Sequence, residues 1–493
     1  MFETAEQVYQ HLLSRAPENK MEPRMQPMYD IMSLLGDPQS SAPVIHLTGT
    51  NGKTTTARII EQVLIAHGLR TGRYTSPHLS KVTERITLDG QPVEDETFVR
   101  IWNEIAPLVD IIDAKLTEAD EQPLTYFETV TALGFAIFAD APVDVMVLEV
   151  GLGGVTDATN VANAQVSVVT PIAVDHADLL GDSPGQIAVE KAGIIKSDGY
   201  LISAVQEPEA AQVLLEAARK KHVNFRFENV EFGVTERSVA VGGQQVSIRG
   251  IAADYNGLFL PLHGAHQVQN LAVAIAALEA FLGAGEQPLN QDVLQDGLAQ
   301  VTSPGRLELL RTHPSLVIDA AHNPQGIEAT ANTLRETFNF SALGLVVGIL
   351  DDKDALGIMT TLFDHFGDEI DHLAVTQSNS PRAIPAEELA EIALDAGWDE
   401  DQIFTTGSVV DAISWAVQGV RDVDAQVQDA GRTLTAGTGG AGVLVTGSIT
   451  LVGQVRELLG AETANTDASV EISGHDDFSE FFPEDPQEDD DES

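Results

Sequence analysis

Residues 44–60, VIHLTGTNGKTTTARII, combine a turn suited to binding phosphate with a candidate metal ligand. Gly49 and Gly52 let backbone N–H groups turn inward around an anion, and Lys53 adds a cation. Thr54 offers a hydroxyl to Mg²⁺, and the helix expected to begin there points its positive end at the phosphates. Only two residues separate the glycines, fewer than in G-x-x-x-x-G-K-[ST]. The turn therefore indicates a nucleotide site, and it leaves open whether the protein is a kinase, a switch, a motor or a ligase.

Two more side chains are expected at the same edge of a sheet. Glu149 ends the apolar run DVMVLEV, and His176 follows VSVVTPIAVDHAD in the same topological position. Ligands of open α/β sheets bind at the carboxyl ends of the strands. We therefore predict that Glu149 and His176 lie beside the phosphate turn as metal ligands. For each residue taken singly, a cap or a surface position is the alternative.

Lys191 lies among small and apolar residues in the helical pattern IAVEKAGIIK. Burial lowers the pKa of a lysine amine, and the neutral amine can take up CO₂ to become a carbamate. A carbamate would offer a hard metal two oxygen atoms. The spacing alone leaves a plain salt-bridged lysine as the alternative.

Short apolar strands and helices alternate around these residues. The strand-like runs include VIHLTG, DVMVLEVG, VSVVTPI and YLISAV, and TARIIEQVLIAHG and FETVTALGFAIFAD have helical spacing. Continuous apolar runs suit parallel strands that helices cover on both faces. The sequence therefore predicts an α/β fold, with an N-terminal P-loop ATPase domain built on a mostly parallel sheet.

A predicted hinge at residues 303–305, Ser-Pro-Gly, divides the chain. Before it, VTERSVAVGGQQVSIRG predicts a β-hairpin that turns at Gly242 and Gly243, an elaboration of the first domain. After it, LVIDAAH, LGLVVGIL, HLAVTQ and GVLVTGS predict a smaller Rossmann-like α/β domain. We expect the domains to span 1–302 and 303–460, with a disordered acidic tail over 461–493.

Composition and charge exclude several classes of protein. The net charge of −48 disfavours a nucleic-acid-binding face, and the absence of cysteine excludes disulfides and thiolate-bound zinc. No apolar run approaches the roughly 20 residues that span a bilayer, and MFETAEQVYQ has no signal-peptide pattern. We therefore expect a cytoplasmic protein without membrane contact. The tail holds 13 acidic residues and no Lys or Arg, and an interaction segment around DDFSEFF is the alternative to simple disorder.

A series of motifs between residues 46 and 459 resembles folylpolyglutamate synthases, including bifunctional dihydrofolate synthases, of the Mur ligase superfamily. The motifs are, in order, GTNGKTT, YTSPHL, LTYFETVTAL, LEVGLGGVTDATN, VDHADLLG, IAVEKAGIIK, HGAHQVQN, PGRLELL, DAAHNPQG and VLVTGS. The resemblance implies an ATP-dependent amide ligase that acts as a monomer. The carboxylate of dihydropteroate or a folate would attack the γ-phosphate of Mg-ATP, and the amine of L-glutamate would displace phosphate from the resulting acyl phosphate.

The resemblance also implies roles for individual residues. Asn270 would contact adenine, Arg306 a phosphate and Asp319 the nucleotide, so that ATP lies between the domains. Thr54 and Glu149 would hold one Mg²⁺, and His176 and carbamylated Lys191 a second. The residues implied for binding ATP at the phosphate turn are Gly49, Thr50, Asn51, Gly52, Lys53, Thr54 and Thr55. Those implied in catalysis are Lys53, His176, Lys191 and His322.

The remaining implied residues concern the other two substrates. His322 and Ser448 belong to motifs associated with glutamate. Ser76, Pro77 and His78 would form a pterin loop, and Thr125, Phe127 and Ala158 would line a dihydropteroate pocket, with local packing as the alternative. Two positions depart from the family pattern: Val155 and Thr156 replace Arg-Leu, and Thr83 replaces Asn. Both put the substrate preference in doubt.

Two other functions compete with the folate assignment. One is a Mur-type ligase that joins an amino acid to a cell-wall precursor, and the other is a non-enzymatic P-loop switch. The motifs TSPHL, LTYFE and EKAGIIK together favour folate over a cell-wall substrate. A switch has no need of an Arg and an Asp from a second domain. Whether the chain makes dihydrofolate, extends glutamate tails or does both stays open.

Overall fold

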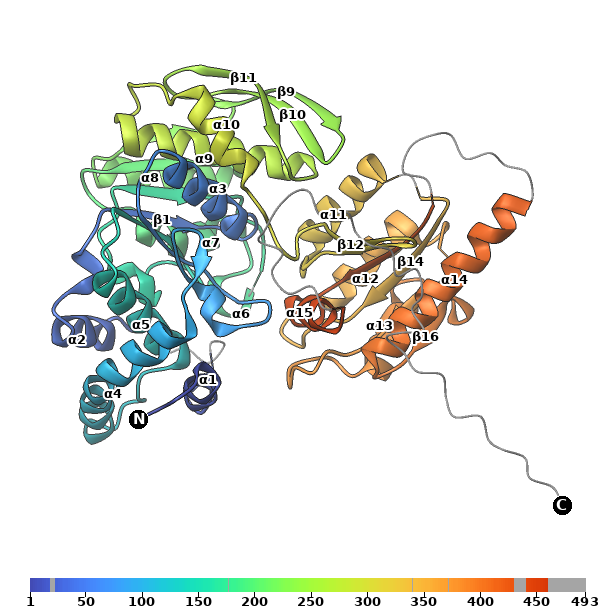
Figure 1. The fold of residues 1–493 in the computed structure, drawn as a ribbon, viewed down its shortest axis with the longest axis horizontal. Helices are drawn as coiled ribbons and strands as arrows, with labels where there is room; N and C mark the ends of the chain where they lie inside the picture. Colours follow the sequence, from blue (N-terminus) through green and yellow to red (C-terminus); the bar gives the residue numbers. More distant parts are fainter. Residues whose placement is uncertain (18–22, 176, 339, 371, 430–439, 460–493) are drawn as a thin grey trace.

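The computed structural model describes residues 1–17, 23–175, 177–338, 340–370, 372–429 and 440–459. His176 and the acidic tail predicted for 461–493 lie outside these residues. The described chain forms two α/β lobes, one on each side of the segment that follows α10 (Gln291–Ala299) (Figure 1). Within the described residues, no helix combines the length and the apolar character needed to cross a bilayer.

The first lobe is built on an eight-stranded sheet with the order β4-β3-β2-β5-β1-β6-β7-β8. In the part of the sheet that runs from β2 through β5, β1, β6 and β7 to β8, all neighbouring strands are parallel. The strands β3 and β4 form an antiparallel edge beside β2. The mostly parallel sheet predicted from the apolar runs is therefore confirmed. The strands are β1 (Val44–Thr48), β2 (Thr71–Tyr74), β3 (Ile86–Leu88), β4 (Gln91–Pro92), β5 (Val145–Glu149), β6 (Val166–Val169), β7 (Tyr200–Ser203) and β8 (Asn224–Phe227).

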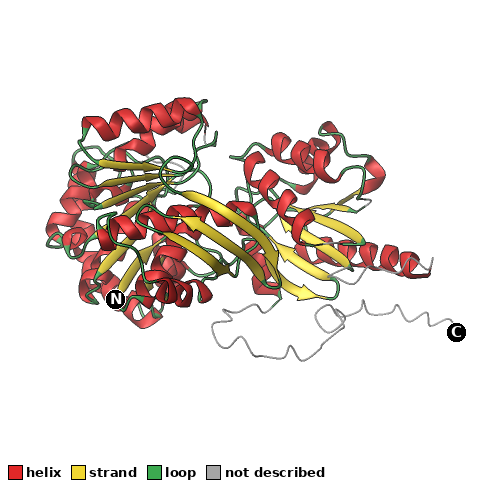
Figure 2. Ribbon diagram, turned by 90° about the horizontal axis from the view of Figure 1, so that it is seen from above, coloured by secondary structure: helices red, strands yellow, loops and turns green. Residues whose placement is uncertain are grey.

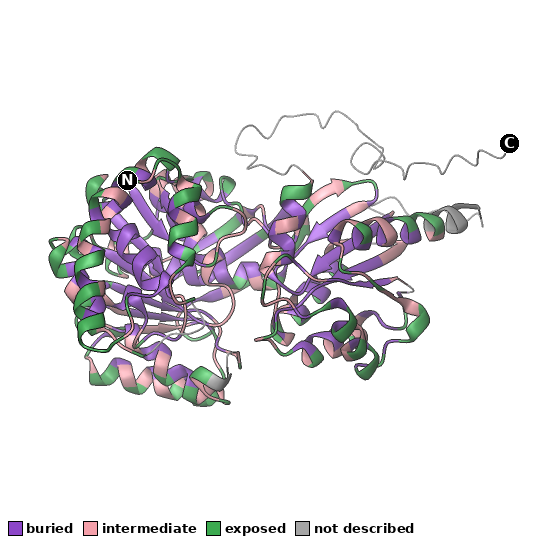
Figure 3. Ribbon diagram, turned by 90° about the horizontal axis from the view of Figure 1, so that it is seen from below, coloured by how far each residue is buried: buried purple, intermediate pink, exposed green. Residues whose placement is uncertain are grey.

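Helices cover both faces of this sheet, which is why its central strands are apolar at nearly every position. Every residue of β1 and β5 is buried, and buried residues follow the central strands of both lobes (Figure 3). One face packs against α3 (Lys53–Ala66), α9 (Ala265–Gly283) and α10. The opposite face packs against α1 (Ala5–Leu13), α2 (Gln26–Leu34), α4 (Asp95–Glu118) and α5 (Tyr126–Asp140). Beyond β6 lie α6 (Ala177–Leu180), α7 (Pro184–Lys191) and α8 (Pro208–Lys220).

The predicted hairpin is part of a separate three-stranded antiparallel sheet. Its strands are β9 (Gly233–Ala240), β10 (Gly243–Arg249) and β11 (Asp254–Leu260), and they lie above α9 and α10 in Figure 1. The turn is one residue earlier than predicted, because Gly243 already pairs with Ala240. Arg237 of β9 donates a hydrogen bond of 2.8 Å to Glu336 of the second lobe. This sheet therefore contacts both lobes.

The second lobe contains a six-stranded sheet with helices beside it (Figure 2). The strand order is β12-β13-β17-β14-β15-β16, and all neighbouring strands are parallel except β12 and β13. The strands are β12 (Glu308–Thr312), β13 (Ser315–Ile318), β14 (Ala342–Val347), β15 (Leu373–Val375), β16 (Ile403–Thr405) and β17 (Ala441–Thr446). One face packs against α11 (Pro324–Thr337), α12 (Ala355–Phe366) and α13 (Ala386–Asp395), and the other against α14 (Val409–Asp429) and α15 (Ile449–Leu458). The Rossmann-like arrangement predicted for this part of the chain is confirmed.

Candidate active site

The phosphate turn connects β1 to α3, and two of its glycines lie where no side chain would fit. Gly49 has a φ of 146°, and a β-carbon there would lie 1.9 Å from Thr170 Oγ1. Gly52 has a φ of 87°, and a β-carbon there would lie 2.4 Å from Asn270 Oδ1. Both glycines are therefore required by space and by backbone conformation. The second contact also brings the predicted adenine ligand Asn270 against the turn.

Lys53 and Thr54 begin α3, one residue earlier than predicted. The Lys53 Nζ donates to the carbonyls of Gly49 and Thr50 at 3.0 and 3.1 Å. Thr54 Oγ1 donates to both carboxylate oxygens of Glu149, at 2.9 and 3.0 Å. The predicted pairing of a hydroxyl with a strand-end carboxylate beside the turn is therefore present.

Charges at this edge strongly affect one another. Burial is the main cause that raises the pKa of Glu149, and the Lys53 charge opposes it. Burial likewise lowers the pKa of Lys53, whereas Glu149 and Asp175 raise it and Lys353 and Arg306 lower it. The last two cations come from the second lobe. Cations from both lobes therefore surround the position expected for the phosphates.

Lys191, the last residue of α7, is buried against the phosphate turn. Its Nζ donates to the Gly49 carbonyl at 2.9 Å, and the side chain is 3% exposed. Burial, and after it the charge of Lys53, lowers the pKa of Lys191 to about 7. The predicted burial of this lysine is confirmed. A large share of its amine is consequently neutral near pH 7, the form that reacts with CO₂.

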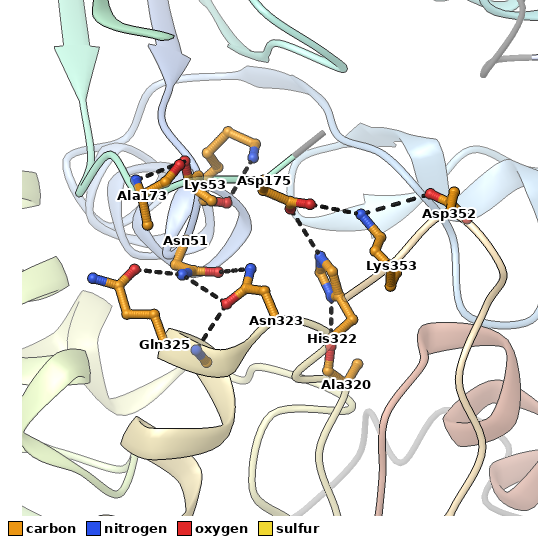
Figure 4. Close-up of polar contacts among 12 residues, drawn as sticks. Asn51, Lys53, Ala173, Asp175, Ala320, His322, Asn323, Gln325, Asp352 and Lys353 are labelled. Carbon is orange, nitrogen blue, oxygen red and sulfur yellow. Dashed lines mark hydrogen bonds and ion pairs between the residues drawn. The ribbon is translucent and has the colours of Figure 1, made fainter. Parts of the chain in front are cut away.

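The second lobe contacts the phosphate turn through an amide cluster (Figure 4). Asn51 and Asn323 exchange two side-chain hydrogen bonds of 3.1 and 3.3 Å, and Asn51 Nδ2 also donates to Gln325 Oε1 at 2.8 Å. At the start of the connecting segment, the hydroxyls of Thr55 and Ser303 are 2.9 Å apart. Side chains of the second lobe and of the connecting segment therefore cover one side of the phosphate turn.

A second contact between the lobes involves opposite charges. Lys353 Nζ lies 3.0 Å from Asp175 Oδ1, and His322 Nε2 lies 3.8 Å from Asp175 Oδ2 (Figure 4). The Asp175 carboxylate favours a charged imidazole, but burial, followed by the Lys353 charge, lowers the pKa of His322 to about 4. Because Nδ1 faces the Ala320 carbonyl at 2.9 Å, the neutral ring carries its proton there. Nε2 of His322 is then an acceptor directed at the space between the lobes.

Asp319 organises the loop that carries Arg306. Asp319 Oδ2 accepts from the Leu307 N–H at 2.8 Å, and Oδ1 accepts from the Ala321 N–H and the Thr330 hydroxyl at 2.8 and 2.9 Å. The carboxylate is buried, at 4% exposed, and fixes the backbone next to Arg306. The structure thus brings both predicted nucleotide ligands of the second lobe to one place.

The predicted pterin loop follows β2 and contains a cis peptide bond between Ser76 and Pro77. His78 Nδ1 accepts from Arg85 Nε at 2.8 Å, and the Tyr9 hydroxyl lies 3.3 Å from His78 Nε2. Burial, followed by the Arg85 charge, lowers the pKa of His78 to about 3. This loop is therefore fixed by contacts from α1 and from the segment before β3.

The other predicted substrate residues are buried and have local packing roles. Thr125 caps α5 and forms a capping box with Glu128, and Phe127 packs against Gly151 just after β5. Ala158 begins a short 3₁₀ helix and is buried. Ser448 caps α15, where its hydroxyl accepts from the Leu451 N–H at 3.3 Å. For Thr125, Phe127 and Ala158 these contacts are compatible with the packing alternative, and the substrate roles of all four residues stay predictions.

Oxygen donors make the site suitable for a magnesium ion. The Thr54 hydroxyl and the Glu149 carboxylate are hard donors of the kind that Mg²⁺ prefers, and ATP phosphates would supply the rest. Among the described residues, no three His, Cys, Asp or Glu side chains gather closely enough to hold a metal by themselves. His176, which was predicted to be the next ligand, lies outside those residues.

A surface pocket beside the turn is lined by Ala173, Glu207, Glu209 and Gln325, among others. Thr50 Oγ1 accepts from the Ala173 N–H at 3.0 Å, so the pocket adjoins the phosphate turn. Its two carboxylates and its lack of a lining Lys or Arg make it unsuited to a polyphosphate. The turn itself stays the predicted phosphate site.

Comparison with known proteins decides the family. Residues 47–278 match the Mur ligase middle domain, and residues 305–439 match the Mur ligase glutamate ligase domain. A dihydrofolate synthase/folylpolyglutamate synthase of Mycobacterium tuberculosis is 42% identical over 92% of this chain and 93% of its own length. The chain belongs to the folylpolyglutamate and dihydrofolate synthase family of the Mur ligase superfamily.

Other members of the synthase family agree in sequence and in fold. The Bacillus subtilis dihydrofolate synthase/folylpolyglutamate synthase is 34% identical over 77% of this chain and 87% of its length. The solved M. tuberculosis folylpolyglutamate synthase complexed with ADP has a TM-score of 0.86, with 93% of this chain and 98% of that chain covered. A complex of a folylpolyglutamate synthase with AMPPCP and folate has 29% identity and a TM-score of 0.75, covering 93% of this chain and all of that chain.

Several polar residues in this synthase site were absent from the sequence prediction. They are Asp175, Asn323, Gln325 and Lys353. Asp175 directly precedes His176, and Lys353 follows the buried run of β14, so each lies near the carboxyl end of a strand. The rule that ligands bind at the carboxyl ends of strands, which pointed to Glu149, would also have indicated Asp175 and Lys353.

Proposed function

We propose that the chain is an ATP-dependent ligase that adds L-glutamate to dihydropteroate, to folates, or to both. The observation that carries this is the enclosure of the turn at Gly49–Thr55 by Glu149 and Lys191 from one lobe and Asn323 and Lys353 from the other. Phosphoryl transfer depends mainly on positioning and on neutralised charge. A site that gathers cations from two lobes around a phosphate turn meets that requirement.

In this proposal, the acceptor carboxylate attacks the γ-phosphate of ATP and the glutamate amine then displaces phosphate. Lys53 and Arg306 hold phosphates, Asn270 contacts adenine, and Asp319 keeps Arg306 in place. Bound Mg²⁺ would neutralise phosphate charge and favour attack at the γ-phosphate. Thr54 and Glu149 would hold one ion, and His176 and Lys191 a second. The neutral His322, with Nε2 as an acceptor, is placed to take a proton from the glutamate ammonium.

We further propose that Lys191 is carbamylated. The neutral amine attacks CO₂, a C–N bond forms and one proton leaves, so a cation is replaced by a carbamate anion. The buried amine with a pKa of about 7 supports this step. The anion would also replace the repulsion between Lys191 and Lys53 by attraction; this repulsion contributes to the lowered pKa of Lys191.

The remaining expectations stay proposals of the same kind. Ser76, Pro77, His78, Thr125, Phe127 and Ala158 would contact the pterin acceptor, and Ser448 and His322 the glutamate. Functional domains would span 1–302 and 303–460, with 461–493 as an acidic tail. We also propose a cytoplasmic monomer, which fits small-molecule substrates.

Phosphate release gives the direct test. The purified protein should release phosphate from ATP only when L-glutamate and a pteroate or folate acceptor are both present. Turnover without either substrate, or turnover with a UDP-linked muramyl peptide, would contradict the assignment. Dihydropteroate and tetrahydrofolate should then be compared as acceptors, with the added glutamates counted by mass spectrometry, to separate the two activities.

A further inference from the structure

Arg58 is a half-buried cation on α3 whose guanidinium has no direct partner among the described residues. Neither a hydrogen bond nor an ion pair joins its side chain to any other residue that the structure describes. Its neighbour Arg73 is very different, since Arg73 Nε lies 2.6 Å from Glu61 Oε2 and Nη1 lies 2.9 Å from Thr75 Oγ1. None of the Arg58 nitrogens is a buried atom, so the guanidinium is open to solvent and can be reached by an anion that is not part of the chain.

The carboxylates around Arg58 are already engaged elsewhere. Glu61 accepts from Arg73 and, at 2.7 Å, from the Thr87 hydroxyl. Glu84 accepts from the backbone N–H groups of residues 79, 80 and 81, at 2.9 to 3.1 Å. Glu149 accepts from Thr54. The guanidinium therefore keeps its five N–H donors for another acceptor.

Helix geometry places Arg58 beside the phosphate site. It lies four residues after Thr54 and three after Thr55, so it shares a helix surface with both. Helical side chains lean toward the N-terminus, which directs the guanidinium back toward the phosphate turn. Burial, followed by the charge of Arg73, lowers the pKa of Arg58 to about 9, although the charges of Glu61, Glu84 and Glu149 oppose this. Arg58 thus remains a cation at pH 7, and it is close enough to Glu84 and Glu149 to be affected by their charges.

The carboxylates of Glu84 and Glu149 lie at the two ends of the space in which the pterin-linked acceptor substrate must bind. Glu149 belongs to the phosphate end, and Glu84 fixes residues 79–81, which continue the predicted pterin loop. Leu79 lies against Gly305 and Gly453 of the second lobe, which closes this space from the other side. A carboxylate that approaches an anionic triphosphate here needs a cation, and the phosphates already have Lys53 nearby.

We propose that Arg58 binds the carboxylate of the pterin-linked acceptor, the group that becomes the acyl phosphate. The inference rests on the proposed ligase function and adds a specificity residue to it. Arg58 orients this carboxylate for attack and distinguishes the acid from a neutral amide of the same shape. A planar guanidinium suits this task, because it can donate two parallel hydrogen bonds to one carboxylate.

Equilibrium binding separates this role from a structural one. Binding of pteroate and of its carboxamide is measured by fluorescence titration, with Mg²⁺ and a non-hydrolysable ATP analogue present. We expect the wild type to bind the acid on the order of 10- to 100-fold more tightly than the amide, as for a charged hydrogen-bonded pair. Arg58→Met should reduce this preference to within about 2-fold, by weakening acid binding and leaving amide binding unchanged. Arg58→Lys should retain part of the preference.

Arg70→Met is the matched control, because Arg70 is a half-exposed arginine whose carboxylate neighbour, Asp89, lies on the surface. It should preserve the acid preference. Unfolding by urea adds a second readout: the stability of Arg58→Met should stay close to that of the wild type, because the substitution removes no hydrogen bond or ion pair between described residues. An equal loss of acid and amide binding, or a raised KM for glutamate with unchanged acceptor binding, would overturn the proposal.

Failure of the ligase function would look different. In that case the wild type itself would bind neither pterin compound and would release no phosphate when acceptor and glutamate are added. If the wild type turns over normally but does not distinguish acid from amide, the Arg58 proposal fails and the ligase function stands.

Discussion

Lys191 contacts the phosphate turn and is also a proposed ligand of the second metal ion, so its substitution tests both roles. Its Nζ contacts the Gly49 carbonyl at 2.9 Å. We expect Lys191→Ala to lower acceptor-dependent phosphate release by at least about 100-fold, because the proposed metal ligand would be lost. Lys191→Glu should restore part of the activity by returning an oxygen ligand. Circular dichroism should show an intact fold in both variants. Near-normal turnover of Lys191→Ala would show that the carbamate hypothesis is wrong.

His46 gives a prediction about stability and pH. It is fully buried in β1, with Nε2 2.8 Å from Thr159 Oγ1, and burial, followed by the Lys196 charge, lowers its pKa to about 3. The unfolded state, with an ordinary pKa of about 6.5, takes up the proton first. Stability is therefore lost as the pH falls below about 6.5, by about 2 kcal/mol at pH 5. The partly buried His78 and His322, whose pKa values are also lowered, act in the same direction.

Urea unfolding at pH 7.5 and pH 5.0 measures this loss. The variant His46→Gln should lose about 2 kcal/mol less than the wild type between the two pH values, whatever its stability at pH 7.5. His222→Asn, a change on the exposed surface at a positive φ that Asn tolerates, should behave like the wild type. Equal losses in the wild type and His46→Gln would contradict the assigned cause.

Residues of the phosphate turn were predictable because their chemistry is local. Gly49, Gly52, Lys53 and Thr54 are adjacent in the chain, and Glu149 follows from the rule for strand ends. Lys353 and Asp175 form their pair across 178 positions, and no local pattern specifies that approach. Arg58 belongs to the same class, because the absence of a partner is a property of the folded structure alone.

At the scale of elements, Asn323 performs two tasks that substitution can separate. Its Oδ1 caps α11 by accepting from the Gly326 N–H at 2.8 Å, and its side chain also pairs with Asn51 of the other lobe. Asn323→Asp keeps the cap and loses the donor to Asn51, so stability should change little. KM for ATP should rise about 2- to 10-fold, as expected for one neutral hydrogen bond.

Asn323→Ala removes both the cap and the bridge. It should therefore raise KM for ATP to a similar extent and also cost about 1 kcal/mol of unfolding free energy. Steady-state kinetics and urea unfolding of the two variants make the comparison. An unchanged KM in Asn323→Asp would show that the amide contact does not help to assemble the site.

Long and strongly apolar elements were predicted better than short ones. The runs that became β1, β5 and β14 are buried, continuous and bounded by turns, so their pattern identifies them. The strands β3 and β4 contain three and two residues, too few for any period. β12 was missed because its positions are only partly buried, and pairing with β13 rather than burial holds it in the sheet.

At the scale of the whole molecule, the charge of −48 predicts stabilisation by salt. Like charges repel over the compact surface, and raising the ionic strength from 0.1 to 1 M shortens the screening length from about 10 to about 3 Å. The melting temperature should therefore rise by on the order of 5 °C between 0.05 and 1 M KCl. Tetramethylammonium chloride should act similarly, because screening depends on charge. A rise with KCl alone would instead indicate specific binding of potassium.

The three-stranded sheet gives the molecule a link between its lobes that lies apart from the phosphate turn. The chain itself connects the lobes near Ser303, and Arg237 of β9 is bonded to Glu336 of α11 well away from that connection in the sequence. Together with the Asn51–Asn323 and Asp175–Lys353 contacts, this bond holds the lobes at several separate points. Rotation of one lobe against the other therefore has to break contacts at the sheet as well as at the turn. Breaking the Arg237–Glu336 bond would remove the hold at the sheet without altering any group proposed to touch a substrate.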